Sequence, residues 1–202
     1  MTAPTVFVVD DKSSVRKSIQ ALVEAAGLQA ETYASAGEFL AAYDPGRAGC
    51  LVLDIRLRGE SGLDLQDELR KRAATLPIII ITGYGDVPAA VRAFKGGAVD
   101  FLRKPVPPKK LVAQIQAAIE TDRRAREITK QRDMVTAHVA HLTPRERQVM
   151  ELLAVGKSSK EIATGLALSV RTVEGHRRNV LRKMEVESAV QLARAIAGVR
   201  RG

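Results

Sequence analysis

The sequence is poor in cysteine, the residue that forms disulfides and many zinc sites, and in aromatic residues. Its 202 residues include one cysteine, Cys50, no tryptophan, three tyrosines and four phenylalanines. A single cysteine excludes an internal disulfide framework and argues against a zinc cluster. Long apolar runs are also missing, because the longest candidate, 77–81, is the length of a strand and a membrane-spanning helix requires ~20 residues. We therefore expect no membrane partner.

The start of the chain also lacks the basic segment and apolar run that mark a secretory leader. Together with the scarcity of cysteine, this absence predicts a cytoplasmic protein. Apolar residues make up 46% of the chain and charged residues 27%, which is the composition of a globular protein with enough apolar material for one large core or two modest ones.

Positive charge is concentrated at one end of the chain. Residues 1–105 hold 13 basic and 13 acidic residues, residues 106–140 hold 7 and 4, and residues 141–202 hold 12 and 6. The successive net charges are 0, +3 and +6. A neutral first half followed by a basic segment is typical of a control domain joined to a domain that binds a polyanion, although a merely solvated basic surface would give the same count.

The first hundred residues alternate short β-branched runs with segments of helical period. This pattern predicts an α/β doubly wound parallel sheet of five strands with helices on both faces. The strands are expected at 5–9, 28–33, 50–53, 78–81 and 99–102. Ser35 with Glu38 forms a capping box for one helix, and Asp86 with Pro88 opens another.

The rest of the chain reads as helix. Residues 121–139 are charge-rich without a consistent apolar face, which predicts a linker, helical but frayed, after a first domain at 1–120. Residues 140–202 predict a small all-α domain of four helices, with start signals at Thr143, Ser158, Ser169 and Ser188. A domain this small and this basic is better suited to binding than to catalysis.

Three acids follow the ends of predicted strands: Asp10 and Asp11 follow the first, and Asp54 follows the third. In a sheet of order 2-1-3-4-5 these strands are neighbours, and their carboxyl ends flank the crevice where the winding reverses. Carboxylates this close repel one another unless a cation joins them, and Mg²⁺ suits one or two carboxylates plus phosphate oxygens. Thr82 and Lys104 fall at the same rim and could hold the oxygens of a phosphoryl group.

These residues carry a family resemblance. Four motifs resemble the flavodoxin-like receiver domain of two-component response regulators over roughly residues 4–120. They are Val8-Val9-Asp10-Asp11, Leu53-Asp54, Thr82-Gly83 and Asp100-Phe101-Leu102-Arg103-Lys104-Pro105. The stretch 82–101 is similar to the FixJ-type branch in particular.

The resemblance implies that Asp54 accepts a phosphoryl group from a cognate histidine kinase and that Lys104 pairs with that group. It implies a Mg²⁺ site made by the carboxylates of Asp10, Asp11 and Asp54 and the backbone carbonyl of Arg56. It also implies a cis peptide at Lys104-Pro105 and a switch formed by two further residues, Thr82 and Phe101. Without the family, Phe101 would pass for an ordinary core aromatic.

Phosphorylation adds about −2 of charge and three acceptor oxygens beside a hydroxyl able to swing toward them, which gives the switch a physical basis. We expect it to remodel the face of the fourth helix and fifth strand and to favour a homodimer. The loop after Asp54 has Arg58 where the family usually places proline. Arg56 and Tyr84 lie two residues beyond Asp54 and Thr82, so we hypothesise that they screen the phosphoryl group from water and set its lifetime.

Two helices joined by a short turn are predicted near the carboxyl terminus. On the second, one stripe collects Arg171, Glu174, Gly175, Arg178 and Arg182, because steps of three, four and seven residues return to the same helical face. Such a helix can lie in the major groove of double-stranded DNA, where Arg reads guanine edges. The alternative interpretation is that this stripe is an ordinary solvent-exposed polar face of the helix and binds no DNA.

The wider pattern resembles the LuxR-type helix-turn-helix from about 140 to 200. The matching segments are Leu142-Thr143-Pro144-Arg145-Glu146, 156–163, 169–176 and Lys183-Met184. Position for position, the resemblance makes Glu174, Gly175 and Arg178 candidates for reading bases. Candidates for phosphate contact are Lys160, Thr172, Arg177 and Lys183.

Taken together, the sequence predicts a transcriptional regulator that is activated at Asp54, dimerises, binds paired DNA half-sites and works with RNA polymerase. Two alternatives remain open. A phosphoester hydrolase could use the same acids with Mg²⁺, but its second acid would stand where Arg56 is. An adaptor could instead dock acidic proteins on the basic domain, and binding to random duplex DNA at low salt separates the two readings.

Overall fold

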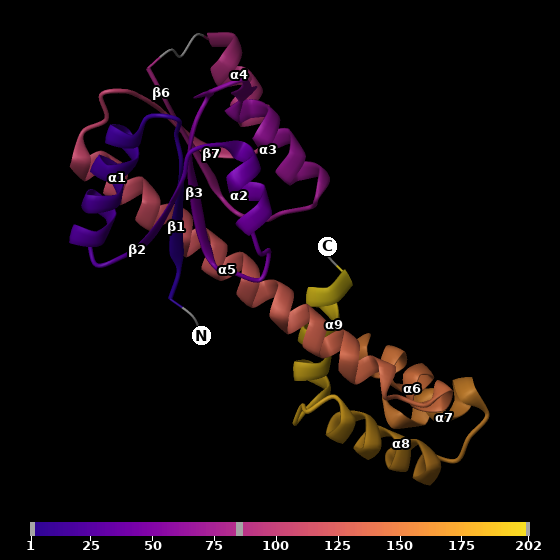
Figure 1. Ribbon diagram of the computed structural model, residues 1–202. Helices are drawn as coiled ribbons and strands as arrows, with labels where there is room; N and C mark the ends of the chain where they lie inside the picture. The colour runs from indigo at the N-terminus through magenta and orange to yellow at the C-terminus, as the bar shows by residue number, and fades with distance from the viewer. Residues whose placement is uncertain (1–2, 84–86, 201–202) are drawn as a thin grey trace. The chain divides into compact units, whose positions relative to one another are not determined.

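The computed structural model describes residues 3–83 and 87–200, and the chain divides into two compact units, residues 1–126 and 127–202. Figure 1 shows an α/β unit followed by a helical one. The division falls inside one helix, α5, so that the first part of α5 belongs to unit 1 and the remainder to unit 2. The domain limits expected from the sequence, 120 and 140, stay predictions.

Unit 1 is built on a parallel sheet of order β2-β1-β3-β6-β7. Its strands are β1 (Thr5–Val9), β2 (Gln29–Tyr33), β3 (Gly49–Asp54), β6 (Ile78–Thr82) and β7 (Ala98–Arg103). Each lies within one residue of the range expected from the sequence, and the doubly wound order is confirmed. A second, two-stranded sheet, β4 (Arg56–Leu57) with β5 (Glu60–Ser61), was not expected.

The two faces of the sheet bury alternate residues of each strand, as the two-residue period of a strand requires. Phe7, Leu51 and Ile80 pack on the side of α2 (Ala36–Ala42), α3 (Gly62–Lys71) and α4 (Val87–Lys95). Val8, Val52 and Ile79 pack on the side of α1 (Ser13–Ala25) and α5 (Pro108–Ala140). Helices therefore cover both faces of the sheet, and the polar side chains of the candidate site lie at the ends of the strands.

Side-chain caps fix where the helices begin. Ser35 accepts a hydrogen bond from the Glu38 amide, but the Glu38 carboxylate bonds the amide of Ala34 instead of closing a capping box on Ser35. The other acid expected at a helix start in this unit, Asp86, lies outside the described residues.

Unit 2 consists of the end of α5 and four shorter helices. These are α6 (Pro144–Ala154), α7 (Ser159–Leu166), α8 (Val170–Lys183) and α9 (Ala189–Arg200). Full capping boxes open α6 at Thr143 and α7 at Ser158, and Ser169 caps α8. One apolar core joins the four helices, with Val149, Ile162, Val173 and Leu192 fully or almost fully buried.

None of the helices within residues 3–83 and 87–200 combines the length and the apolarity that crossing a membrane requires.

Candidate functional site

The carboxyl end of the sheet brings together the three acids that the sequence singled out. Parallel pairing sets Val9 opposite Leu53, so Asp10 and Asp54 come at the same edge of neighbouring strands. Oxygens of Asp10, Asp11 and Asp54 lie within 4.8 Å of one another. Asp10 and Asp54 are buried, whereas Asp11 is partly exposed.

The ammonium of Lys104 bridges two of these acids. Its Nζ lies 2.6 Å from Asp10 Oδ2 and 2.6 Å from Asp54 Oδ2. The Lys104 amide donates to the Thr82 carbonyl at 2.8 Å, which fixes the backbone beside the pocket, and the peptide from Lys104 to Pro105 is cis. The structure thus places residues 10, 54 and 104 close enough to share one small anion.

Burial and charge shift the pKa values at this site. Burial raises the pKa of the Asp10 carboxyl above its ordinary value, although hydrogen bonds from Lys104 and the Lys12 amide oppose the rise. Burial alone would lower the pKa of Lys104, but its hydrogen bonds to Asp10 and Asp54 outweigh that effect and raise it. Lys104 therefore stays protonated and can hold an anion.

Hard oxygen ligands in this arrangement fit Mg²⁺. Mg²⁺ takes oxygen ligands such as carboxylates. Oxygens of the three acids lie within 4.8 Å of one another, so these residues could contribute ligands to one ion. Three carboxylates against one ammonium also leave an excess of negative charge for a cation to offset.

The residues expected to form the switch lie on the next two strands. Thr82 ends β6 and is fully buried. Phe101 is on β7, opposite Ile80, and its partly exposed ring packs against the core on the α2–α4 side of the sheet. Their hydroxyl and ring are thus on the strands that lead to α4 and α5.

The loop after Asp54 folds back as a short hairpin, and one of its amides bonds the acid. Arg56 is exposed, and its amide donates to Asp54 Oδ1 at 3.2 Å. The β4–β5 hairpin turns at Gly59, whose φ is 78°, so the loop has a defined turn without the expected proline. The role of the Arg56 carbonyl in metal binding stays a prediction, and the other residue of the lifetime hypothesis, Tyr84, lies outside the described residues.

Sequence reasoning missed Gly62. A Cβ at this position would lie 2.1 Å from the Asp54 carbonyl oxygen, so only glycine lets α3 start beside the acid. The one signal available was a glycine directly after the capping residue Ser61.

The basic surface of unit 2 is formed by α7 and α8. Lys160, Arg171, Arg178 and Arg182 are exposed, and within residues 3–83 and 87–200 none of them has an ion-pair partner. Arg92 on α4, by contrast, pairs with both Asp64 and Asp67. A run of unpaired cations on one helix pair is an electrostatic footprint for a polyanion.

Four other predicted contact residues of α8 are either held by a hydrogen bond or only partly exposed. Thr172 shares a hydrogen bond of 2.8 Å with the capping hydroxyl of Ser169. Gly175 and Arg177 are partly exposed. Glu174 is exposed and accepts a hydrogen bond from the Ser159 hydroxyl.

Lys183 has a partner inside the unit. Its Nζ lies 2.7 Å from Glu146 Oε2, which is buried, and 3.3 Å from the His141 carbonyl. This ion pair ties the end of α8 to the start of α6. The assignment of Lys183 to phosphate contact stays a prediction, and the structure gives the residue a second role.

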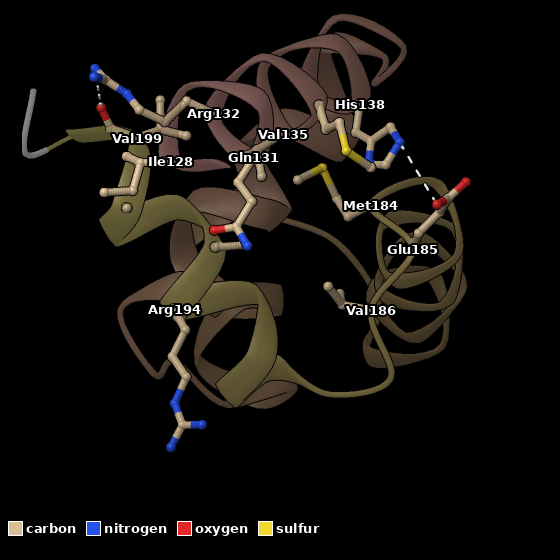
Figure 2. Close-up of a pocket in the computed structure, with 13 residues that line it drawn as sticks. Ile128, Gln131, Arg132, Val135, His138, Met184, Glu185, Val186, Arg194 and Val199 are labelled. Atoms are coloured by element: carbon tan, nitrogen blue, oxygen red, sulfur yellow. Dashed lines mark hydrogen bonds and ion pairs between the residues drawn. The ribbon is translucent and has the colours of Figure 1, made fainter. Parts of the chain in front are cut away.

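Unit 2 also has a groove of about 470 Å³ between α5 and α9, drawn in Figure 2. Its wall is mainly apolar, with Ile128 and Val135 contributed by α5 and Val199 by α9, and its polar rim includes His138, whose Nε2 lies 3.9 Å from Glu185 Oε2. Among the described residues, the lining contains a single acid, Glu185, and so offers no carboxylate cluster like the one at the strand ends.

Comparison with known proteins assigns both units. Residues 6–116 match the response regulator receiver domain family, and residues 140–196 match the bacterial regulatory proteins of the luxR family. Nodulation protein W of Bradyrhizobium diazoefficiens is 44% identical over 193 residues, which are 96% of this chain and 85% of that protein. Transcriptional regulatory protein FixJ of Azorhizobium caulinodans is 42% identical over 196 residues, which are 96% of this chain and 93% of that one.

Solved structures give the same result. The response regulator StyR has a TM-score of 0.88 at 38% identity and covers 97% of this chain and 99% of its own. Full-length FixJ from B. japonicum has a TM-score of 0.61 at 40% identity and covers 99% and 98%. The chain therefore belongs to the two-component response regulators of the FixJ type, transcriptional regulators that join a receiver domain to a LuxR-type DNA-binding domain.

Proposed function

We propose that Asp54 accepts a phosphoryl group from a histidine kinase, with Mg²⁺, and that this modification controls binding of paired DNA half-sites. The observation that carries the proposal is the bridge from Lys104 to Asp10 and Asp54, which gathers a buried nucleophilic carboxylate and a protonated amine at one edge of the sheet. Receiver domains bind Mg²⁺ at such an acidic pocket, and Asp10, Asp11 and Asp54 would hold it here.

In the proposed transfer, a carboxylate oxygen of Asp54 attacks the phosphorus of a phosphohistidine. The new O–P bond forms as the P–N bond breaks, and the imidazole leaves with that electron pair and takes up a proton. The Lys104 ammonium, already 2.6 Å from Asp54, would then pair with a phosphoryl oxygen. Bound Mg²⁺ would supply charge neutralisation for the phosphoryl oxygens and the carboxylates.

The switch in this proposal is the hydroxyl of Thr82 and the ring of Phe101. The new phosphoryl oxygens attract the hydroxyl, and the space it vacates admits the ring. The face of α4 and β7 supports dimerisation as the output, because it exposes large apolar side chains. They are Val87, Val91, Phe94 and Val99, all at least 46% exposed.

A receiver dimer would present two DNA-binding units to an inverted repeat. In that complex Glu174, Gly175 and Arg178 would face bases, while Lys160, Arg171, Thr172, Arg177 and Arg182 would contact the backbone or the groove edge. Lys160, Arg171 and Arg182, which are exposed and have no ion-pair partner among the described residues, support this assignment. As a transcriptional regulator the chain would act in the cytoplasm, on DNA and with RNA polymerase.

The phosphoryl step is tested with Asp54→Asn. Incubation with acetyl phosphate and Mg²⁺, followed by intact-mass measurement, should add a phosphoryl group to the parent chain and none to the variant. Asp133→Asn removes an exposed acid of unit 2 and serves as the matched control, with uptake unchanged. Equal uptake by Asp54→Asn and the parent would refute the proposed acceptor.

The DNA step is tested by selecting bound fragments from a random duplex pool, with and without the phosphoryl donor. Arg178→Ala should relax the base preference at one position, because one good bidentate contact is worth about 1–3 kcal/mol of discrimination. Lys160→Ala should instead weaken binding to all duplexes and lower the salt dependence. If both variants keep the same selectivity, the assignment of Arg178 to base reading is wrong.

A further inference from the structure

The acid on the basic helix α8 makes no ion pair with any residue that the structure describes. Glu174 has Arg171 three residues before it and Arg178 four residues after it, and residues at these spacings are neighbours on a helix surface. A glutamate placed four residues before a basic residue is the favoured orientation. Among the residues that the structure describes, however, Glu174 is paired with neither arginine. Its carboxylate has a different partner, a hydroxyl group.

A serine on the preceding helix holds it. Ser159, the first residue of α7, donates its hydroxyl proton to Glu174 Oε1. The position of Ser159 is fixed in turn, because the capping box of Ser158 with Glu161 sets the start of α7. The contact therefore joins the two helices of the helix-turn-helix through side chains that the fold places in advance.

The chemistry at both ends of the contact sets its direction, because an ionised carboxylate can only accept a hydrogen bond. Arg177 Nη1 lies 3.5 Å from Ser159 Oγ, and a guanidinium can only donate. The single proton of the serine hydroxyl must then go to Glu174, which leaves the order Arg177 to Ser159 to Glu174. One carboxylate oxygen is used, and within the described parts of the chain the other has no hydrogen-bond partner.

We propose that Ser159 is a positioning residue for sequence readout: it holds Glu174 away from Arg171 and Arg178 and aims its free oxygen at the amino group of a base. In the major groove that amino group is N4 of cytosine or N6 of adenine, and carboxylates accept preferentially from cytosine N4. The two arginines remain available to phosphates and guanine. This inference rests on the proposed DNA binding by α8.

The contact between Glu174 and a base should contribute more to sequence selectivity than to overall affinity for DNA. A carboxylate adds nothing to phosphate attraction, and its desolvation against a base without a donor is unfavourable. A fixed Glu174 therefore penalises thymine and guanine edges at its position, because both present acceptors there. Loss of the serine hydroxyl frees the carboxylate to pair with Arg178, which should blur the preference at that base pair.

The experiment compares the phosphoryl-donor-treated full chain with four variants in selection from a random duplex pool. The variants are Ser159→Ala, Ser159→Thr, Glu174→Gln and the double variant Ser159→Ala with Glu174→Gln. Affinity for a fixed random duplex at the same salt is measured in parallel. Thr164→Ala is the matched control, because its hydroxyl is also on α7 but bonds the Lys160 carbonyl.

Ser159→Ala should lower discrimination at one base pair by about tenfold, the lower end of what a hydrogen bond to a charged group contributes, and leave random-duplex affinity within about twofold. Glu174→Gln should affect the same base pair, and the double variant should add nothing to it. Ser159→Thr, which keeps a hydroxyl, should retain the parent preference. Thr164→Ala should change neither quantity.

Three outcomes would overturn the inference. The first is relaxed selectivity in Glu174→Gln with none in Ser159→Ala. The second is a uniform loss of affinity for every duplex in Ser159→Ala, which would make the serine a phosphate contact. The third is additive effects in the double variant. If the parent chain itself selects no sequence, the proposed DNA function fails, and that result differs from all three.

Discussion

At the scale of single residues, Gly62 constrains the backbone at the proposed acceptor, Asp54. Its Cβ position is 2.1 Å from the Asp54 carbonyl oxygen, and a backbone atom cannot move aside cheaply. Gly62→Ala should slow phosphoryl uptake by about tenfold and lower the free energy of unfolding by about 2 kcal/mol, as a forced backbone shift typically does. Uptake of acetyl phosphate and urea unfolding measure the two effects.

The control for this prediction is Gly37→Ala on α2. A Cβ there meets nothing nearer than the Ser35 hydroxyl at 3.9 Å, which is ordinary contact. Alanine should be neutral or slightly stabilising at this helical position. Normal uptake by Gly62→Ala would mean that α3 yields without moving Asp54.

A second residue-scale prediction concerns the pair of Glu146 with Lys183. The hydrogen bond from Lys183, helped by the Thr143 amide, lowers the pKa of the Glu146 carboxyl below its ordinary 4.5. A lowered pKa in the folded state stabilises the fold above the unfolded value and loses that contribution as pH falls through the folded value. Lys183→Met should therefore cost about 2 kcal/mol at pH 7, because the carboxylate is buried.

The difference between Lys183→Met and the parent should shrink as the pH falls below 4.5, where Glu146 becomes protonated in both. Urea titrations across this pH range, with hydrogen exchange of the α6 amides as the reporter, give the measurement. Lys157→Met is the control, since its pair with Glu161 is half exposed and should contribute little. A constant difference at all pH values would exclude this linkage.

At the scale of elements, α5 is tied to the loop before β3. Asp122 on α5 is buried, and its Oδ2 accepts from the Gly49 amide at 2.9 Å and from Arg126 Nε at 2.8 Å. Arg126 in turn donates to the carbonyls of Pro45, Gly46 and Arg47. The helix therefore stays attached to unit 1 beyond the last core residues that cover the sheet.

Asp122→Ala should detach this part of α5. It leaves the buried Gly49 amide without its acceptor, so unit 1 should lose about 2–3 kcal/mol, and exchange of the amides at 119–126 should speed up strongly. Hydrogen exchange read by mass spectrometry locates the effect. Arg124→Ala removes only an exposed pair with Glu120 and should leave exchange unchanged. Unaltered exchange in Asp122→Ala would show that packing alone holds the segment.

These elements also show what the sequence could and could not predict. The strands and the caps at Thr143 and Ser158 were predictable, because period, propensity and capping are local signals. The β4–β5 hairpin was not, since two-residue strands carry no period. The contact of Asp122 with Gly49 was also missed, because its partners are 73 residues apart and meet only after the sheet forms.

For the candidate site the same distinction holds. Asp10, Asp54 and Lys104 could be placed together because all three follow strands whose order is predictable, and the structure joins them. Gly62 could not be identified as a constraint, since the approach of α3 to Asp54 depends on the path of the hairpin. The partner of Lys183 was likewise hidden, as a basic residue on a basic helix gives no sign of a buried acid elsewhere.

At the scale of the whole molecule, the two units differ in net charge and in the apolar side chains that they expose. Residues 1–126 carry a net charge of +3 and residues 127–202 carry +6. The exposed cations of α7 and α8 are unpaired within the described residues, which suits a polyanion. Unit 1 offers instead the apolar side chains on α4 and β7, which suit a protein partner.

Dimerisation through that apolar face gives the last prediction. Phe94 on α4 is 51% exposed, so a charge there disturbs no core, but it would be desolvated unpaired in a dimer interface. Phe94→Glu should take up the phosphoryl group normally and remain monomeric by sedimentation, whereas the phosphorylated parent should dimerise. Its affinity for an inverted repeat should fall at least tenfold, with that for a single half-site unchanged, because only the repeat gains from two linked units.

Val155→Glu places the same charge at an exposed apolar position of unit 2 and should leave the phosphorylated dimer intact. Dimers of Phe94→Glu would move the interface elsewhere on the receiver. A phosphorylated parent that stays monomeric yet binds the repeat more tightly would instead mean that the modification acts within one chain. A receiver surface that forms no dimer cannot link binding at one half-site to binding at the other.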